Sequence, residues 1–253
     1  MQLELYFKKQ PNNTFFKKLG QLLKMNKFAK IIEIVSIFLV AFLFIQLFIT
    51  NETSDLLYNQ MVIWFANIFM LAIVFTGIKL RGEGLSHFGF SFKKINLKSG
   101  FKTFYQSLFV FIIALAGFVI GSIIMANITG IPETSDMSGY DYLKDNYWML
   151  LLTLGGTYIV ASFGEEVIYR AFLINRISEL GLSTKIGKIL TVTISAIIFG
   201  FAHYTWGPMG IVQTAFMGLA LGICYLSFKK RIWILILAHA YMDTILMLQM
   251  YHT

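Results

Sequence analysis

The sequence has little charge, little proline and almost no cysteine. Charged residues make up 13% of the 253 positions, about half the share found in soluble proteins. The single cysteine, Cys224, excludes an internal disulfide, and because it lies in an apolar run we interpret it as a packing residue. With 57% apolar residues, 25 Phe and only 3 Pro, the composition excludes an ordinary soluble domain and is typical of a polytopic membrane protein.

Long apolar runs make up most of the chain. Runs of about 20 apolar residues can cross a bilayer, and we count about seven. They lie near 31–50, 58–78, 104–128, 147–169, 189–204, 211–228 and 232–250. The first lacks a small-residue cleavage site, so we predict a retained span and not a signal peptide. The predicted fold is all-α, a transmembrane helical bundle with the lipid bilayer as its environment.

The net charge of +8 follows an alternating pattern along the chain. Basic residues fall in the connections 8–30, 79–102, 170–188 and 229–231. The other connections carry Lys144 as their only basic residue and are otherwise acidic, with Glu52, Asp55, Glu133, Asp136, Asp141 and Asp145. This positive-inside pattern predicts a cell-membrane protein with a cytoplasmic N-terminus and a C-terminus outside. The basic excess therefore reflects topology, and we expect no nucleic-acid partner.

The segment before the first run combines lysines with apolar residues at near-helical spacing. Phe15, Leu19, Leu22 and Met25 recur in this way within 14–30, which predicts a basic amphipathic helix on the inner leaflet. We divide the chain into three parts on this basis. They are an interfacial segment 1–30, N-terminal transmembrane helices 31–144, and transmembrane helices 145–253 that carry the candidate site.

Ionisable residues occur in the last apolar runs, where a lipid-facing sequence should have none. They are Glu165, Glu166, Arg170, His203, His239 and Asp243. Each alone has a structural interpretation, such as a histidine that hydrogen-bonds a neighbouring helix. Charged groups at membrane depth are costly, however, and usually face a protein-lined cavity for function. Because several helices can present polar atoms to one point in a bundle, their concentration in one half favours a common site.

Helical spacing indicates how these side chains are arranged. Glu166 and Arg170 are four residues apart, so they can neutralise each other on one helix face. Glu165 projects about 100° away from Glu166 and is a candidate general base towards water. His239 and Asp243 also share a face.

Three motifs appear in order on successive spans: EEVIYR at Glu165–Arg170, FGFAH at Phe199–His203 and HAYMD at His239–Asp243. This series of EExxxR, FxxxH and HxxxN or HxxxD resembles the membrane-embedded CaaX prenyl endopeptidase and bacteriocin-processing family, also called Abi or CPBP. The resemblance covers about residues 145–245. It implies an intramembrane endopeptidase that forms no covalent acyl-enzyme.

The resemblance also implies roles for individual residues. Glu165 would activate a water with help from His203, and His239 with Asp243 would stabilise the oxyanion. In a supporting role, Glu166 and Arg170 would hold the helix and tune the catalytic glutamate, while Phe199 would pack.

Asp243 departs from the pattern of the prenyl-protein processing members, which carry Asn at this position. An ionised Asp cannot donate a hydrogen bond to an oxyanion. Asp243 is therefore protonated, orients His239, or serves a different substrate.

Zinc is the competing chemistry at this site. Glu165, His203 and His239 could provide three ligands with one open position. The sequence has no HExxH pair, which is the compact way to hold zinc in a protease. We favour the glutamate mechanism and expect no cofactor.

The predicted spans place two of these residues at different depths. Glu165 lies late in an outward-to-inward span, whereas His203 lies late in an inward-to-outward one. The fifth span, however, has only about 16 apolar residues, roughly 24 Å of helix, so its hairpin could turn below the outer surface. Alternatively, a helix break at Gly164 could lift Glu165 towards the middle of the bilayer.

Three classes of function fit these residues. We favour a protease that cuts a membrane-associated peptide or protein, such as a bacteriocin or pheromone precursor or a prenylated protein. The second class is a bacteriocin self-immunity protein. The third is a proton-coupled transporter, which the absence of recognisable repeated halves disfavours.

Overall fold

The computed structural model describes residues 2–50, 55–92, 96–129 and 135–252, so Glu52 and Glu133 lie outside the described residues. Every regular element in these ranges is a helix, which confirms the all-α prediction. Seven helices are long and apolar enough to cross a membrane, as predicted. They are α3 (Lys27–Phe48), α4 (Leu56–Arg81), α5 (Leu97–Thr129), a continuous helix over Tyr147–Ser178, α8 (Lys185–Ala202), the span Tyr204–Ser227 with α9 (Gly207–Ser227), and α10 (Ile232–His252).

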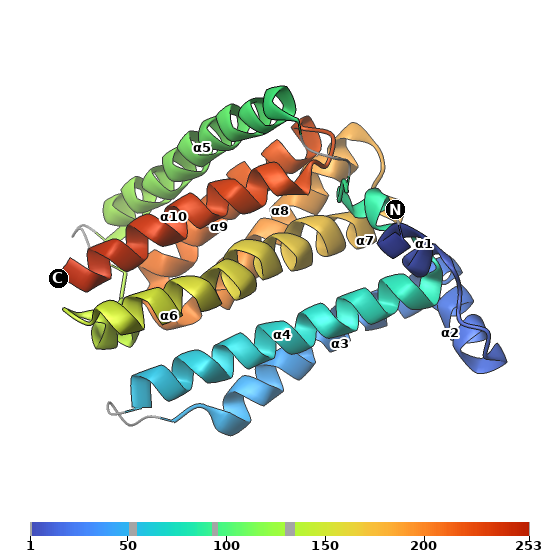
Figure 1. Ribbon diagram of the computed structural model, residues 1–253, viewed down its shortest axis with the longest axis horizontal. Coiled ribbons are helices and arrows are strands. Elements are labelled where there is room, and N and C mark those ends of the chain that lie inside the picture. The colour runs from blue at the N-terminus through green and yellow to red at the C-terminus, as the bar shows by residue number, and fades with distance from the viewer. Residues whose placement is uncertain (1, 51–54, 93–95, 130–134, 253) are drawn as a thin grey trace.

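The long helices form two groups with the Tyr147–Ser178 helix between them (Figure 1). α3 and α4 pack together on one side. On the other side α9 packs against both α5 and α8, and α10 packs against α5 and the central helix. Because the central helix also contacts α4, it joins the two groups and holds the candidate site between them.

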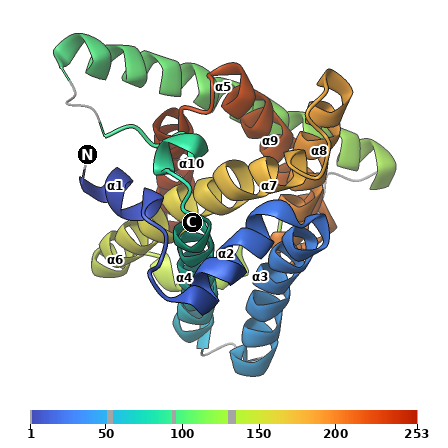
Figure 2. The ribbon, with the colours of Figure 1, turned by 90° about the vertical axis from the view of Figure 1, so that its right-hand side faces the viewer.

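The two chain ends lie at opposite ends of the bundle (Figure 1), as expected for an odd number of spans. The basic connections gather at the N-terminal end, where α1 (Gln2–Lys8) and α2 (Thr14–Met25) lie across the helix ends (Figure 2). The 3₁₀ turn η2 (Leu85–Phe88) lies at this end too. The basic residues therefore lie at the one end of the bundle where the charge pattern predicts them. The orientation with this end in the cytoplasm stays a prediction.

The predicted interfacial helix over 14–30 is α2, and it ends at Met25. Asn26 stops it and caps the next helix, because its side chain accepts a hydrogen bond from the backbone of Ala29. The first long helix therefore begins at Lys27, inside the segment that we assigned to residues 1–30. Phe15 and Met25 of α2 are exposed, which is compatible with the predicted attachment to a membrane surface.

The central helix runs without a break from Tyr147 to Ser178 and consists of α6 (Tyr147–Thr157), the π-helical segment η4 (Tyr158–Ile174) and α7 (Asn175–Ser178). The predicted span ended at 169, so the observed helix is longer, and it is not broken at Gly164. Glu165 consequently lies well inside a helix of 32 residues. The π-helical hydrogen-bonding pattern is rare and is frequently found at functional sites.

The helix lengths explain how Glu165 and His203, which the predicted spans place at different depths, reach the same site. α8 is the shortest of the seven membrane-length helices in the described ranges, with 18 residues. It ends at Ala202, and the chain turns through the 3₁₀ segment η5 (Tyr204–Trp206) directly into α9. With this short hairpin and the long central helix, His203 and Glu165 line the same cavity.

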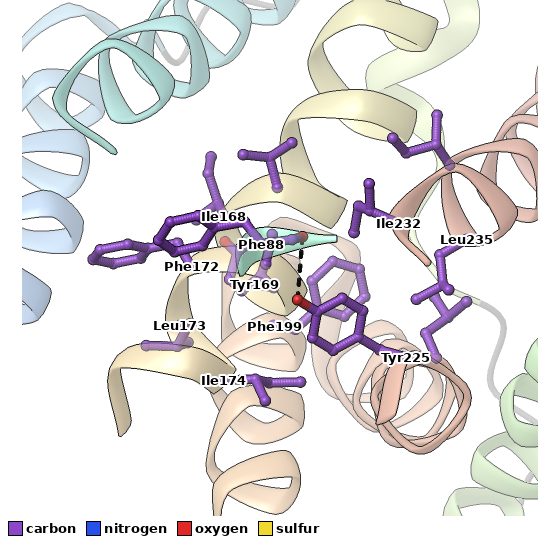
Figure 3. Packing of buried hydrophobic residues seen from close by; sticks show 14 of the residues in the cluster. Phe88, Ile168, Tyr169, Phe172, Leu173, Ile174, Phe199, Tyr225, Ile232 and Leu235 are labelled. Carbon is purple, nitrogen blue, oxygen red and sulfur yellow. Dashed lines mark hydrogen bonds between the residues drawn. The ribbon is translucent and has the colours of Figure 1, made fainter. Parts of the chain in front are cut away.

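A buried cluster anchors η4 against its neighbours (Figure 3). The hydroxyl of Tyr225 on α9 donates to the backbone carbonyl of Phe88 at 3.2 Å. The rings of Tyr169 on η4 and Phe199 on α8 also meet edge to face, at 4.9 Å between ring centres. Such pairs add to the stabilisation from burial, so the helix that carries Glu165 and Glu166 is held on several sides.

Candidate active site

A cavity of about 390 Å³ lies between the two helix groups and has all four predicted catalytic residues in its wall: Glu165, His203, His239 and Asp243. Its volume is typical of a ligand-binding pocket. Most of the remaining wall is apolar. Part of it comes from α3, α4 and α5, with Phe38, Ala41, Ile45, Trp64, Met70 and Phe111. Residues distant in sequence thus meet in one apolar cavity.

His239 on α10 is buried and contacts three carboxylates. Its Nδ1 lies 2.8 Å from Oε1 of Glu166. Because a carboxylate can only accept, Nδ1 carries the proton of this bond. Nε2 points the other way, 3.8 Å from Oε2 of Glu165 and 3.7 Å from Oδ1 of Asp243. The imidazole is therefore fixed by Glu166. Because Nε2 also faces two carboxylates, the ring is assigned a proton on both nitrogens, so that Nε2–H is a donor as well.

Glu166 and Arg170 form the ion pair that their spacing predicted, with 2.9 Å between Oε1 and Nη1. Both side chains are fully buried. The Arg170 guanidinium lies 4.2 Å from the ring centre of Phe199, in the geometry of a cation–π contact. Phe199 therefore contributes more than the apolar packing that we predicted. Glu166 contributes more than support for its own helix, because it also binds His239.

Glu165 occupies a different environment from its neighbour Glu166. Its side chain is 14% exposed, whereas that of Glu166 is completely buried. Its Oε2 has no hydrogen bond to any described residue. The part of the side chain that stays exposed can meet a water molecule in the cavity, as a general base must.

His203 follows the last residue of α8 and lines the cavity from the hairpin turn. Its Nδ1 lies 2.9 Å from the carbonyl oxygen of Phe199. An Nδ1–H donated to that carbonyl leaves the Nε2 lone pair available as an acceptor. The His203 ring is held between Phe199 and Trp206, at 4.8 and 4.7 Å between ring centres.

Ser162 and Tyr140 belong to this site, and neither was among the sequence candidates. The Ser162 hydroxyl donates to Oδ2 of Asp243 at 2.6 Å. Its position three residues before Glu165 on the same helix was a usable signal. Tyr140 lines the cavity from η3 (Ser138–Leu143). It lies in a polar connection outside the apolar runs, so no pattern in the sequence indicated it.

The alternative zinc site does not fit this geometry. Across the described ranges, no three His, Cys, Asp or Glu side chains form a group that could hold a metal ion. We therefore derive no step through zinc.

Residues 147–245 match the family described as type II CAAX prenyl endopeptidase Rce1-like. This part of the chain belongs to the CaaX protease family. The assignment confirms the resemblance drawn from the motifs, and all seven residues named for the site and its support lie within the matched range. Comparisons with curated proteins and with solved structures give no match.

The match assigns a CaaX-type membrane protease to the C-terminal part of a multi-pass chain. The CaaX protease region supplies the ionisable wall of the cavity, whereas α3, α4 and α5 precede the matched range and supply much of the apolar wall. The complete cavity thus needs both halves of the protein.

Proposed function

We propose that this protein is a glutamate-type intramembrane endopeptidase that hydrolyses a membrane-associated peptide or protein. The observation that supports this most is the meeting of Glu165, His203, His239 and Asp243 in one largely apolar cavity. A lipid-facing or purely structural set of charges would have no need of such a cavity. Candidate substrates are small membrane-anchored chains, such as bacteriocin or pheromone precursors, and prenylated proteins.

The reaction begins with a water molecule held between Glu165 and His203. Glu165 takes a proton from the water while the water oxygen forms a bond to the carbonyl carbon of the peptide. The carbonyl π electrons move to oxygen, and His239 stabilises the resulting oxyanion through Nε2–H. When the oxyanion collapses, the C–N bond breaks and the proton held by Glu165 passes to the leaving nitrogen. No acyl-enzyme forms, and Glu165 returns to its starting state.

Replacing Glu165 by alanine tests this function directly. Peptides from the membranes and the medium are compared by mass spectrometry between cells with the intact protein and cells with Glu165→Ala. We expect one or a few precursors to accumulate only in the variant, because loss of a general base lowers the rate by about 10²–10⁴-fold. Asp141→Ala, at an exposed carboxylate outside the cavity, is the matched control and should process the precursors normally.

Two further outcomes separate the alternatives. Identical peptide profiles for the intact protein and Glu165→Ala would contradict the proposed protease, and immunity to a bacteriocin that survives this substitution would favour a binding role. Purified protein treated with a strong chelator should keep its full Glu165-dependent activity. Loss of activity that added zinc restores would overturn the metal-free mechanism.

A further inference from the structure

An oxyanion in an apolar cavity needs hydrogen-bond donors, and Asp243 is poorly arranged to be one. Its Oδ2 already accepts from Ser162 at 2.6 Å, and its Oδ1 faces Nε2 of His239 at 3.7 Å. Both carboxylate oxygens thus face donors, which leaves Asp243 as an acceptor. The second donor that an Asn amide could provide at position 243 is missing from this chain.

Tyr140 places a phenol in the same cavity. It comes from η3, which connects α5 to the central helix and packs against α4, α6 and α10. The Tyr140 ring meets the ring of Trp206 edge to face at 6.4 Å, and Trp206 in turn contacts His203. Within the described residues the Tyr140 hydroxyl forms no hydrogen bond. The phenol is therefore positioned by its ring while its O–H stays free to bind substrate.

We propose that Tyr140 is a catalytic residue whose hydroxyl donates to the oxyanion in place of the amide that Asp243 lacks. The proposal rests on the proposed peptidase function. In the step, the O–H bond of Tyr140 stays intact and only a hydrogen bond forms as charge develops on the carbonyl oxygen. Two donors, His239 Nε2–H and Tyr140 O–H, then stabilise the intermediate.

The electrostatic surroundings keep this phenol protonated. Burial raises the pKa of Tyr140, and the negative charges of Asp243 and Glu165 raise it further. Tyr140, Asp243 and Glu165 all line the same cavity, so the phenol shares its surroundings with both carboxylates. At any pH at which the protein works, Tyr140 is therefore a donor and not a phenolate.

Tyr142 offers a matched control in the same segment. Its hydroxyl lies 3.1 Å from Oγ1 of Thr153, and it does not line the cavity. Tyr140→Phe and Tyr142→Phe each remove one hydroxyl from η3, but only the first removes a group that can reach substrate.

Purified protein, Glu165→Ala, Tyr140→Phe and Tyr142→Phe are incubated with the detergent-solubilised membrane-peptide fraction of cells that carry Glu165→Ala. New peptide ends that form only with an intact Glu165 are quantified over time. We expect Tyr140→Phe to lower kcat by about 10²–10³-fold with little change in KM, the effect of losing one oxyanion donor. Tyr142→Phe should keep the wild-type rate, and all four proteins should unfold at similar temperatures.

A second substitution distinguishes donation from packing. In an Asp243→Asn background the amide supplies a donor, so Tyr140→Phe should cost at least tenfold less than in the natural sequence. An equal cost in both backgrounds would overturn the proposal, as would a wild-type rate for Tyr140→Phe. No Glu165-dependent product from the intact protein would instead overturn the proposed function and the inference with it.

Discussion

Among single residues, Glu166 links two parts of the site that have different tasks. Its Oε1 contacts both Arg170 at 2.9 Å and Nδ1 of His239 at 2.8 Å. The carboxylate thereby neutralises a buried guanidinium and fixes the imidazole that faces Glu165. A change at this one residue should disturb stability and catalysis together.

Glu166→Gln tests this linkage. The substitution leaves the buried charge of Arg170 uncompensated, so we expect the free energy of unfolding to fall by about 3–5 kcal/mol. Thermal or denaturant unfolding in detergent measures the loss. Adding Arg170→Met should recover part of the stability, because the unpaired charge is removed as well. If the losses of the two substitutions instead add, the Glu166–Arg170 ion pair does not stabilise the folded protein.

The sequence predicts contacts between these residues only where they are local. The Glu166–Arg170 pair follows from a spacing of four residues, and the structure confirms it. The bond from Ser162 to Asp243 joins segments 81 residues apart, and no spacing rule reaches that far. The position of Tyr140 is harder still to predict from the sequence, because its place in the cavity depends on how η3 packs against three other helices.

At the scale of whole helices, close approach of α5 and α9 depends on glycine. A Cβ at Gly117 would lie 2.7 Å from the carbonyl oxygen of Phe216, and one at Gly121 would lie 2.9 Å from the Cα of Gln213. The four-residue spacing of these glycines is the small-xxx-small pattern of membrane helices. Here it serves packing within one chain.

Gly121→Ala should therefore separate α5 from α9 slightly and destabilise the protein. We expect a loss of about 1–3 kcal/mol, the usual cost of overpacking, measured as a lower unfolding temperature in detergent. Gly155→Ala is the matched control, since a Cβ at this helical glycine meets no atom within 4 Å. Equal unfolding temperatures for the two variants would show that the α5–α9 contact tolerates the methyl group.

Helix number was predictable from apolar runs, but helix ends were not. All seven spans are present, because about 20 apolar residues have few alternatives to crossing a bilayer. The central helix, however, extends past the predicted end to Ser178 because polar residues such as Asn175 and Arg176 are buried by tertiary contacts. Local hydropathy does not detect such partners.

Across the whole molecule, a network of buried ion pairs ties the N-terminal helices to the central helix. Arg176 of α7 lies 2.7 Å from Glu33 of α3 and 2.6 Å from Glu179. Glu33 also pairs with Arg81 of α4, and Arg81 lies 2.7 Å from Glu83. Both arginines are completely buried. The network therefore fixes the end of the helix that carries the site against α3 and α4.

Acid should weaken this connection. Burial alone would raise the pKa of Glu179, but hydrogen bonds from His87 and Lys30 and the charges of Arg176 and Lys30 outweigh it and lower this pKa to about 2. A lowered pKa in the folded state stabilises the protein above the ordinary value of 4.5, and this stabilisation is lost as the pH falls from there through about 2.

We expect the unfolding temperature in detergent to fall across this acid range. Glu179→Gln should already be less stable at neutral pH and should lose less on acidification, whereas Asp141→Asn, at an exposed position, should follow the wild-type curve. Parallel curves for wild type and Glu179→Gln would show that this carboxylate does not contribute to the acid response.

The origin of the cavity walls in separate parts of the chain has an evolutionary consequence. The reactive side chains come from residues 147–245, while Phe38, Trp64 and Met70 face them from helices outside that range. Under the proposed function, mutations in α3 or α4 should thus alter which substrates bind and leave the residues assigned to catalysis unchanged. Evolution can therefore change the substrate range of such a hydrolase through substitutions in α3 and α4, while the reactive side chains of residues 147–245 are kept.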